Sequence, residues 1–522
     1  MRKLKSLIAA FLIISTVFFI GCSNIQVPIL KNGSDLHEIT AVSKAATRYR
    51  SIDILDDTVL LLSLKGIAPY DLTLYNIREN KITAQKILAD FPLENITEAK
   101  FNGSDQIIVC DENNKKAITY DFDLDQTGEI DYTVSEWDHN NVPESELIAD
   151  YFSFTDDYAY HTDNDNFYFV LYDKPDKVYF FKNYAQNILA EHNGLLFVEN
   201  SIYSEDSDSF TLTVSAIDYE NELCVNEISF DVTGKNRFID IQNFVISDKY
   251  ICFTELIIND ETNAVKEIPY LWKYTENPLN KTVEVKKMTV DDLNEDNNHI
   301  IKEIKEKYGI DIKVNEPAEH TSFESDYDAP AISVNSLLRG LSEVFALFPD
   351  NFIKEIYRDQ KNDSRFSIYV VSNIDGAGGY AFDSSDYYQI VFATMTFDKS
   401  VAVHELMHLI DNRIIDYYKA HNSDFDKLWC NLNPDGFDYL DNNYYDEEYF
   451  ITEYASTNID EDMAEMFRFM YYAYKNGDNW FNEYEHINKK AVLLCEAIRK
   501  AFPSMENTED VFWEKYVEFA EQ

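Results

Sequence analysis

The stretch Thr211–Phe230, TLTVSAIDYENELCVNEISF, alternates apolar and polar side chains on both sides of the polar turn Asp218–Glu222. A period of two gives a strand one buried and one exposed face, so two such runs around a short turn predict a β-hairpin. The same pattern occurs four more times in the first half of the chain, at residues 72–83, 107–120, 167–181 and 251–271. These repeats predict an all-β domain over residues 51–287.

The spacing of the later hairpins indicates which all-β fold to expect. Their turns centre near Pro175, Glu220 and Glu261, which are 45 and 41 residues apart. This interval suits the four-stranded blades of a β-propeller, each of which takes roughly 40–50 residues. We therefore expect a propeller-like domain, and a pair of β-sandwiches is the alternative that the pattern leaves open.

The period of the sequence changes in the second half of the chain. Residues 288–298 are acidic and polar, and we interpret them as a linker to a second domain at 299–522. That domain contains two short strand patterns, at 366–371 and 389–394, and a helical pattern throughout the region after Asp398. It is therefore predicted to be α+β, with its helices at the C-terminal end.

The chemistry of the second domain is indicated by residues 403–411, VHELMHLID, which contain His-Glu-x-x-His. Residues four apart lie on the same face of a helix, so His404 and His408 can bind one zinc ion. Glu405 can then act as general base toward a water molecule at the metal. Asp398 is placed to cap this helix. The competing interpretation is a structural helix with two surface histidines.

A catalytic zinc site needs a third protein ligand and an open position. Zincins that place a Gly and a third His farther along the same helix are excluded, because Asp411 and Ile414 occupy those positions. The other source is a carboxylate from a later helix. Glu461 and Glu465 lie one turn apart in a later helical pattern, and Asp460 is a further candidate.

Two blocks of the second domain, residues 403–411 and 454–465 (YASTNIDEDMAE), resemble the catalytic domain of anthrax lethal factor and the Pro-Pro endopeptidases. These proteins are gluzincin metallopeptidases. The resemblance implies a zincin fold with Glu461 as the third zinc ligand. It also implies that Glu465 orients a ligand histidine, as the outer carboxylates of many zinc sites do.

The resemblance gives roles to two more side chains. Tyr454 would hydrogen-bond the oxyanion that forms during peptide hydrolysis, and a buried core tyrosine is the structural alternative. Asp411 follows the second histidine at the spacing of the family motif. It would orient a ligand histidine or only solvate the end of the helix.

These observations predict a zinc-dependent endopeptidase with one Zn²⁺ per chain. The substrate is expected to be a peptide or protein, held in extended form against the edge strand predicted at 389–394. One alternative is a catalytically silent zincin scaffold that carries the β-rich domain as a binding or adhesion module for an unknown ligand. Another is a hydrolase of non-peptide amides.

The N-terminus indicates where the protein acts. Met1–Lys5 is basic, Ser6–Ile20 is almost wholly apolar, and Gly21-Cys22 follows. This arrangement resembles the signal peptide and lipobox of bacterial lipoproteins, which implies a signal peptide at 1–21 and a lipid on Cys22. The polar residues 22–50 are interpreted as a tether. We expect a membrane-anchored protein on the extracytoplasmic face, with a plain secretory signal or an uncleaved anchor as the alternatives.

The composition excludes one class of partner. The chain has 94 Asp and Glu against 45 Lys and Arg, a formal net charge of −49. Proteins that bind nucleic acid need a basic surface, so no nucleic-acid partner is expected. Five cysteines remain after Cys22, with no spacing typical of a disulfide framework, so they are interpreted as buried small side chains.

Overall fold

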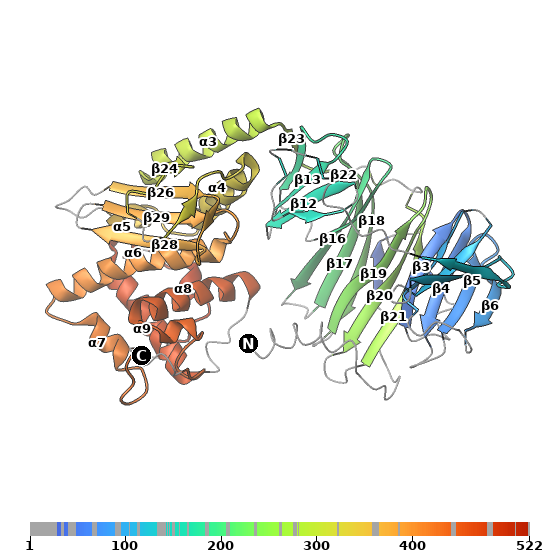
Figure 1. Ribbon diagram of the computed structural model, residues 1–522. Coiled ribbons are helices and arrows are strands. Elements are labelled where there is room, and N and C mark those ends of the chain that lie inside the picture. Colours follow the sequence, from blue (N-terminus) through green and yellow to red (C-terminus); the bar gives the residue numbers. More distant parts are fainter. Residues whose placement is uncertain are drawn as a thin grey trace. The chain divides into compact units, whose positions relative to one another are not determined.

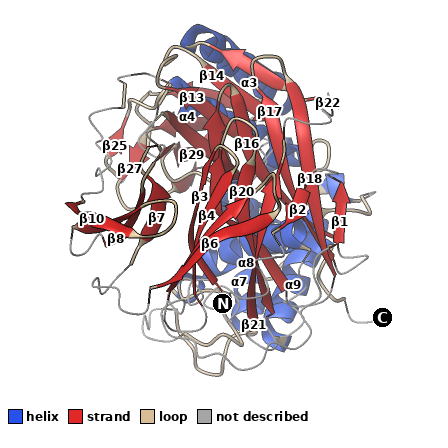
Figure 2. Cartoon of the chain, turned by 90° about the vertical axis from the view of Figure 1, so that its right-hand side faces the viewer, coloured by secondary structure: helices blue, strands red, loops and turns tan. Residues whose placement is uncertain are grey.

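The computed structural model describes residues 29–32, 36–39 and 48–519, with internal gaps of which the longest are 65–69, 89–95, 133–141, 358–364, 440–444 and 478–483. The predicted signal peptide and Cys22 lie outside the described residues. The chain forms two compact units. Strands make up the first half of the sequence, and helices dominate its last third (Figures 1 and 2).

Within the described residues, the strands up to β23 form five sheets, which follow one another along the sequence (Figure 1). The first sheet contains β3 (Arg48–Leu55), β4 (Thr58–Leu64), β5 (Tyr70–Asn76) and β6 (Lys81–Ile87). The second contains β7 (Glu98–Phe101), β8 (Ile107–Asp111), β9 (Lys116–Tyr120) and β10 (Gln126–Asp131). The third contains β11 (Ser153–Phe154), β12 (Tyr158–Asp163), β13 (Asn166–Leu171), β14 (Val178–Lys182) and β23 (Val285–Met288).

The last two sheets also recruit strands from the beginning of the chain. The fourth contains β15 (Asn187–His192), β16 (Leu195–Ser204), β17 (Ser209–Asp218) and β18 (Leu223–Thr233), with β1 (Ile29–Asn32) and β22 (Lys281–Thr282) paired to β18. The fifth contains β19 (Arg237–Ile246), β20 (Ile251–Asn259), β21 (Ala264–Trp272) and β2 (Leu36–Glu38). Residues from the start of the sequence therefore complete a sheet near the end of the strand-rich half.

The all-β class predicted for the first half is confirmed, and so are its five hairpins. They correspond to the pairs β5–β6, β8–β9, β13–β14, β17–β18 and β20–β21. Buried side chains fill the spaces between neighbouring sheets. One cluster joins the first sheet to the second, one joins the fourth to the fifth, and one joins the fifth back to the first. Packing of the last sheet on the first is the arrangement of a propeller-like domain.

The tether predicted for residues 22–50 is wrong where the structure describes it. Ile29–Asn32 pairs with β18 and Leu36–Glu38 pairs with β21, both antiparallel, and β3 already begins at Arg48. These strands were missed because each is only a few residues long and pairs with residues nearly two hundred positions away or more. A short run without a neighbouring hairpin partner carries no local alternation that could identify it.

The linker predicted for residues 288–298 is also wrong, because helix α3 spans Val290–Tyr308. Thr289 caps it by accepting from the Asp292 backbone N–H, and the Asp292 side chain accepts in return from the Thr289 backbone. Leu293 is buried on one face of the helix. The acidic and polar residues cover the exposed face, so they reflect a solvated helix and not an unstructured connection.

The boundary between the two units is not a single cut in the sequence. Val142–Asp163 and Tyr168–Val178 group with the C-terminal unit, which otherwise begins at Lys287. Within that unit, the Tyr168 hydroxyl donates to Asn335 Oδ1 at 3.2 Å. The predicted division at residue 287 is therefore only approximate.

The C-terminal unit is α+β, with a mixed sheet in the order β24–β26–β29–β28. Its strands are β24 (Asp311–Val314), β26 (Arg365–Val371), β28 (Gly379–Ser384) and β29 (Tyr387–Ala393), and β25 (Ser325–Asp326) pairs separately with β27 (Asn373–Ile374). Its further helices are α4 (Ala331–Ala346), α5 (Phe352–Tyr357), α6 (Lys399–Ala420), α7 (Phe425–Cys430), α8 (Ile459–Asn476) and α9 (Glu485–Ala501). It also contains the short 3₁₀ helices η2 (Tyr454–Ser456), η4 (Pro503–Met505) and η5 (Phe512–Glu514). Helices follow Asp398 to the end, as predicted.

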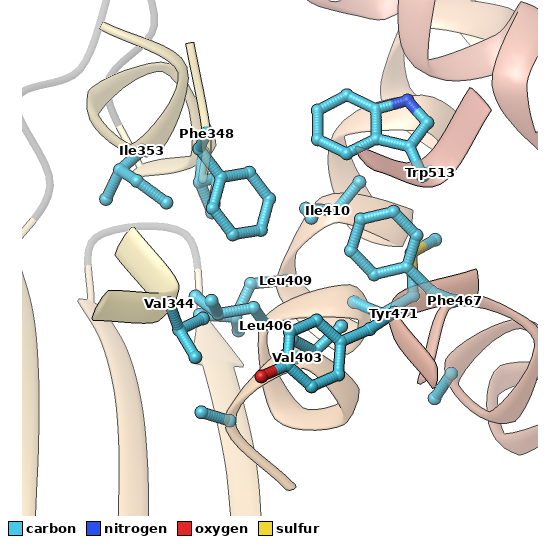
Figure 3. Close-up of a cluster of buried hydrophobic side chains, with 14 of the residues drawn as sticks. Val344, Phe348, Ile353, Val403, Leu406, Leu409, Ile410, Phe467, Tyr471 and Trp513 are labelled. Atoms are coloured by element: carbon cyan, nitrogen blue, oxygen red, sulfur yellow. The ribbon is translucent and has the colours of Figure 1, made fainter. Parts of the chain in front are cut away.

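One buried cluster joins the helices of this unit to its sheet (Figure 3). Helix α6 contacts β28 and β29 on one side and α8 on the other. Val403, Leu406 and Ile410 of α6 are fully buried, and Phe467 of α8 lies in the same cluster. This packing fixes α6 and α8 against each other. Among the described residues, no helix is both long and apolar enough to cross a membrane.

Candidate metal centre

Helix α6 presents both histidines of the motif. Asp398 caps its first turn by accepting from the backbone N–H groups of Ser400 and Val401, as expected from the sequence. The rings of His404 and His408, one helical turn apart, lie with their centroids 5.0 Å apart and nearly perpendicular to each other. His404 is buried, and the side chain of His408 is 20% exposed. The two imidazoles therefore lie on one face of α6.

Helix α8 brings a carboxylate to the same place. Its cap is Asn458, whose side chain accepts from the Glu461 backbone N–H at 2.9 Å, and Gly477 ends the helix in a left-handed conformation. The sequence predicts Gly477 as the end of this helix and offers Thr457 or Asn458 as its cap, and the structure has Asn458. Glu461 Oε2 lies 3.1 Å from His404 Nε2 and 3.7 Å from His408 Nε2. Residues 53 or more positions apart in the sequence are thus brought together by the packing of α6 on α8.

These three side chains fit a zinc ion. A tetrahedral ion with bonds of 2.0–2.2 Å holds its ligand atoms about 3.3 Å apart, and the ligand atoms here all lie within 4.8 Å of one another. Among the described residues, Glu461 Oε2 is buried and has no hydrogen bond of good geometry, although the Nε2 atoms of His404 and His408 are its close neighbours, which is the setting expected of a metal-ligand atom. In the part of the chain that the structure describes, this is the only such group of three potential ligands.

The electrostatics of Glu461 agree with this arrangement. Burial alone would raise the pKa of Glu461, but the adjacent imidazoles of His404 and His408 outweigh it and hold the pKa below its usual range. The carboxylate is therefore ionised at neutral pH, which is the state in which it can coordinate a metal.

Glu465 lies one turn farther along α8 and contacts the opposite nitrogen of His404. Its Oε1 is 3.1 Å from His404 Nδ1, and the residue is 3% exposed. A proton on Nδ1 that is donated to this carboxylate leaves the lone pair of Nε2 directed toward Glu461. The arrangement matches the orienting role that the sequence resemblance implies for Glu465.

Glu405 is buried beside the histidines, and burial is the main reason that its pKa is raised to about 7. The Ala381 backbone N–H of β28 donates to its carboxylate. A Cβ atom at Gly379, on the same strand, would be in tight contact with Glu405, 3.1 Å from its Cγ. Glu405 is thus held between α6 and the first half of β28.

The predicted edge strand was assigned to the wrong segment. β29, which covers most of residues 389–394, is paired on both sides, with β26 in parallel and with β28 antiparallel. β28 is the strand at the edge of the sheet next to α6. The sequence did not indicate this strand because the glycine-rich stretch Gly376–Gly379 leads into it and includes its first residue, and glycines suggest a turn.

Tyr454 is in η2, immediately before α8. The residue is 53% exposed, and its ring centroid lies 6.2 Å from that of His404, with the two ring planes 21° apart. Partial burial and the nearby Glu461 carboxylate raise the pKa of Tyr454, so its hydroxyl keeps its proton at neutral pH. The buried core position considered as an alternative from the sequence does not fit this exposure.

Asp411 is near the histidines in sequence but is not bonded to them in the arrangement above. It is 4% exposed, and its Oδ1 atom has no hydrogen-bond partner among the described residues. Burial, followed by the charges of Asp460, Asp426 and Asp383, raises the pKa of Asp411 well above its usual range. It does not solvate the helix end, which was the structural alternative, and its orienting role stays a prediction.

Two residues of the site were not found by sequence reasoning. The Thr452 hydroxyl donates to Glu465 Oε2 at 2.9 Å, and Arg468 Nη1 donates to Glu465 Oε1 at 3.2 Å. The spacing of Glu465 and Arg468, three residues apart on a predicted helix, is a sequence signal for this ion pair. Thr452 gave no comparable signal, because its partner depends on the path of the chain before α8.

Comparisons with known proteins do not identify a family. No family model matches the chain, and no curated protein does. Similar solved structures include the WD40 domain of Toxoplasma gondii coronin, with 8% identity, 51% of this chain and 100% of that chain covered, and a TM-score of 0.18. The β-propeller domain of the Trilobed protease from Pyrococcus furiosus has 9% identity, coverages of 44% and 96%, and a TM-score of 0.17.

A streptogramin B lyase is a third similar structure, with 10% identity, 44% of this chain and 86% of that chain covered, and a TM-score of 0.18. TM-scores this low carry no argument about function. The description of the strand-rich half as propeller-like rests on its own sheets and on the clusters between them.

Proposed function

We propose that this protein is a zinc-dependent endopeptidase. The observation that carries the proposal is the convergence of His404, His408 and Glu461, whose ligand atoms lie within 4.8 Å of one another on two helices of one core. Glu405 is buried directly beside them, and Glu465 is bonded to the far side of His404. A ligand set, a candidate base and an orienting carboxylate together support a catalytic zinc site over a purely structural one.

The roles of the side chains follow from their positions. A zinc ion bound here would polarise the substrate carbonyl and make a water molecule acidic enough to attack it near neutral pH. Glu405 accepts the proton of that water and passes it to the leaving amine. Tyr454, protonated and exposed next to His404, donates a hydrogen bond to the oxygen on which negative charge develops. Glu465 keeps the proton of His404 on Nδ1 throughout.

The substrate is proposed to bind in extended form along β28. In the described residues this strand pairs only with β29, so its outer edge is available to a further strand. Backbone pairing at a sheet edge is a general way to hold a peptide, because it does not depend on the peptide's side chains. Glu405 contacts the backbone of Ala381 in this strand, so a peptide on that edge would pass the candidate base.

The test of the function is a metal analysis followed by a digestion. Purified protein without residues 1–22 is expected to contain about one zinc per chain and to cleave members of a peptide library, with cleavage lost on chelation and restored by zinc. Protein that binds zinc but cleaves no peptide would favour the silent scaffold. Protein that binds no zinc would reject the site itself.

We also propose that the protein is anchored to the outer face of the cell membrane through a lipid on Cys22. The support is the basic, apolar and Gly-Cys sequence of residues 1–22, which lies outside the described structure. Cys22→Ala is expected to release the protein from membranes or to leave the precursor unprocessed. Normal processing with unchanged membrane retention would contradict the lipid anchor.

A further inference from the structure

We propose that Thr452 and Arg468 are positioning residues of the metal centre, which act together through Glu465. Arg468 fixes the carboxylate that orients His404, and Thr452 ties the same carboxylate to the turn that carries Tyr454. The inference rests on the proposed function and adds two residues to it. Neither residue belongs to the group of three potential ligands, so each is expected to act on the metal through Glu465.

Glu465 is the centre of this network. It is 3% exposed, and donors surround both of its oxygen atoms. Oε1 faces His404 Nδ1 at 3.1 Å and Arg468 Nη1 at 3.2 Å, and Oε2 accepts from the Thr452 hydroxyl at 2.9 Å. A buried carboxylate with this many donors has one preferred orientation, because any rotation would leave a charged oxygen without partners.

Thr452 connects two parts of the site with one hydroxyl group. While it donates to Glu465, it also accepts from the Ala455 backbone N–H at 3.0 Å. A hydroxyl has one donor and two acceptor positions, so both bonds can form together. Ala455 lies in η2, next to Tyr454. The position of Tyr454 relative to His404 is therefore linked to the orientation of Glu465 through a single side chain.

Arg468 connects Glu465 to the start of the helix that carries both histidines. Its Nε donates to Ser400 Oγ at 3.0 Å, and its Nη2 donates to the Tyr472 hydroxyl at 3.2 Å. Ser400 and Tyr472 are themselves 2.8 Å apart through their hydroxyl oxygens. The guanidinium group thus holds three acceptors in one plane, which a lysine could not reproduce.

The two residues should have different effects. Loss of the Arg468 guanidinium removes the positive charge next to Glu465 and the link to α6, so it should weaken zinc binding. Loss of the Thr452 hydroxyl should weaken zinc binding and should also allow η2, which carries Tyr454, to shift. The rate constant kcat should therefore fall by more than the loss of bound zinc accounts for. Changes to groups behind a metal ligand typically lower metal affinity 10–100-fold.

The experiment measures the zinc dissociation constant by chelator competition, together with kcat and KM at saturating zinc, on protein without residues 1–22. We expect Thr452→Val and Arg468→Gln to bind zinc about 10–100-fold more weakly than the unchanged protein. At saturating zinc, Thr452→Val should still have a reduced kcat with little change in KM, whereas Arg468→Gln should recover most of its kcat. Thr452→Ser restores the hydroxyl and should restore both quantities.

Thr457→Val is the matched control. The Thr457 hydroxyl donates to the Tyr454 carbonyl at 2.7 Å in the same turn but does not contact Glu465, so zinc affinity should be unchanged. Thermal unfolding of each zinc-free variant separates weak binding from loss of fold. If a variant is unfolded, the conservative variants Thr452→Ser and Arg468→Lys are compared instead. Full zinc affinity in Thr452→Ser together with a partly reduced zinc affinity in Arg468→Lys supports the inference.

The inference is overturned if Thr452→Val and Arg468→Gln both bind zinc within about twofold of the unchanged protein. If Arg468→Gln does not fold, Arg468→Lys is measured instead of it, and the same limit applies. It is also overturned if Thr452→Ser is as defective as Thr452→Val, because the hydroxyl would then not be the responsible group. A failure of the proposed function looks different, since in that case the unchanged protein itself would bind no zinc or cleave no peptide.

Discussion

The two halves of this protein bury their side chains in different ways. In the strand-rich half, separate clusters fill the spaces between neighbouring sheets, and each sheet is built mainly from consecutive strands. In the C-terminal unit, one large cluster extends from Ile300 to Val517 and joins the helices to the sheet, and a smaller cluster that includes Tyr369 and Val391 is formed by alternate residues of the same sheet. The strand-rich half repeats a local unit, the sheet of consecutive strands. The C-terminal unit instead packs segments that are distant in the sequence against one another. This packing brings the potential metal ligands of α6 and α8 together.

The same contrast applies to buried charge. Glu267 in the strand-rich half is 5% exposed and accepts from the Tyr49 backbone N–H at 2.6 Å, and the charge of Arg48 acts on it without outweighing the effect of burial. In the C-terminal unit, the buried carboxylates of Glu465 and Asp462 are each bonded to a cation, Arg468 and Lys490 respectively. Substitutions of these groups should therefore change the stability of one half at a time.

The largest effect is expected at the third metal ligand. Glu461→Ala removes a ligand atom, so bound zinc and peptide cleavage should be lost together, while the strand-rich half keeps its unfolding behaviour. Glu465→Ala removes only the orienting carboxylate and should weaken zinc binding 10–100-fold. Zinc content by metal analysis and the thermal unfolding profile are the measurements. Normal zinc in Glu461→Ala with none in Glu465→Ala would show that the ligand was assigned one helical turn too early.

A large loss of stability confined to the C-terminal unit is expected at Lys490. Its ammonium group is fully buried and 2.6 Å from Asp462 Oδ2, which also accepts from Trp429 Nε1 and the Tyr439 hydroxyl. Lys490→Met leaves Asp462 buried without its cation, which should cost about 3–5 kcal/mol. The neighbouring Lys489→Met is the control, because its ion pair with Glu485 is exposed.

The measurement for this pair of variants is chemical unfolding followed by the fluorescence of tryptophans in each half. A transition of the strand-rich half that moves as much as that of the C-terminal unit would contradict separate cores. Equal effects of Lys490→Met and Lys489→Met would show that the buried pair contributes no more than a surface one.

Tyr454→Phe tests whether the exposed hydroxyl of Tyr454, near the proposed zinc site, takes part in catalysis. The ring stays in place next to His404, and only the hydroxyl is removed, so zinc content and stability should be unchanged. The rate constant kcat should fall by about 10²–10³, the usual loss for one oxyanion donor, with little change in KM. Steady-state kinetics on a cleaved library peptide provide the measurement. An unchanged kcat would leave Tyr454 as a surface side chain without a catalytic role.

The smallest effect is expected in the strand-rich half, at Glu267. Burial is the main cause that raises its pKa from 4.5 to about 7. The folded state therefore holds a proton that the unfolded state releases, so stability is complete below about pH 4.5 and falls as the pH rises toward 7. Glu267→Gln removes this penalty and should stabilise the half by up to about 3 kcal/mol at pH 8, with little gain at pH 5.

Urea unfolding at the two pH values, monitored on the strand-rich half, checks this prediction. Glu79→Gln, on an exposed turn of the same half, is the control and should change the free energy of unfolding by less than about 0.5 kcal/mol. A gain from Glu267→Gln that is the same at both pH values would mean that ionisation of Glu267 is not its cause.

Local patterns decided what the sequence could predict. The hairpins were recognised because both strands of each pair lie within some twenty residues, and the caps of α6 and α8 were recognised from Asp398, Asn458 and Gly477. The spacing of His404, Glu405 and His408 is sufficient by itself to indicate a metal site. Each of these signals is carried by residues close together in the chain.

Features that depend on distant contacts were missed or misread. β1 and β2 were missed because they pair with strands near the end of the strand-rich half. The polar face of α3 was interpreted as a linker. β28 was missed because glycines at its start indicated a turn. In the metal centre, the partners of Glu465 depend on how the chain approaches α8. A single sequence contains the local pattern of these segments but not the contacts that give them their structure.

The most direct test of the proposed mechanism is the Glu405→Gln variant, compared with the unchanged protein for zinc content and for kcat/KM on one library peptide. Glutamine keeps the shape of the side chain and leaves His404, His408 and Glu461 intact, so about one zinc per chain should be retained. Because only the base is lost, the rate should fall by about 10²–10⁴. Glu405→Gln that cleaves peptide at the rate of the unchanged protein would contradict the mechanism.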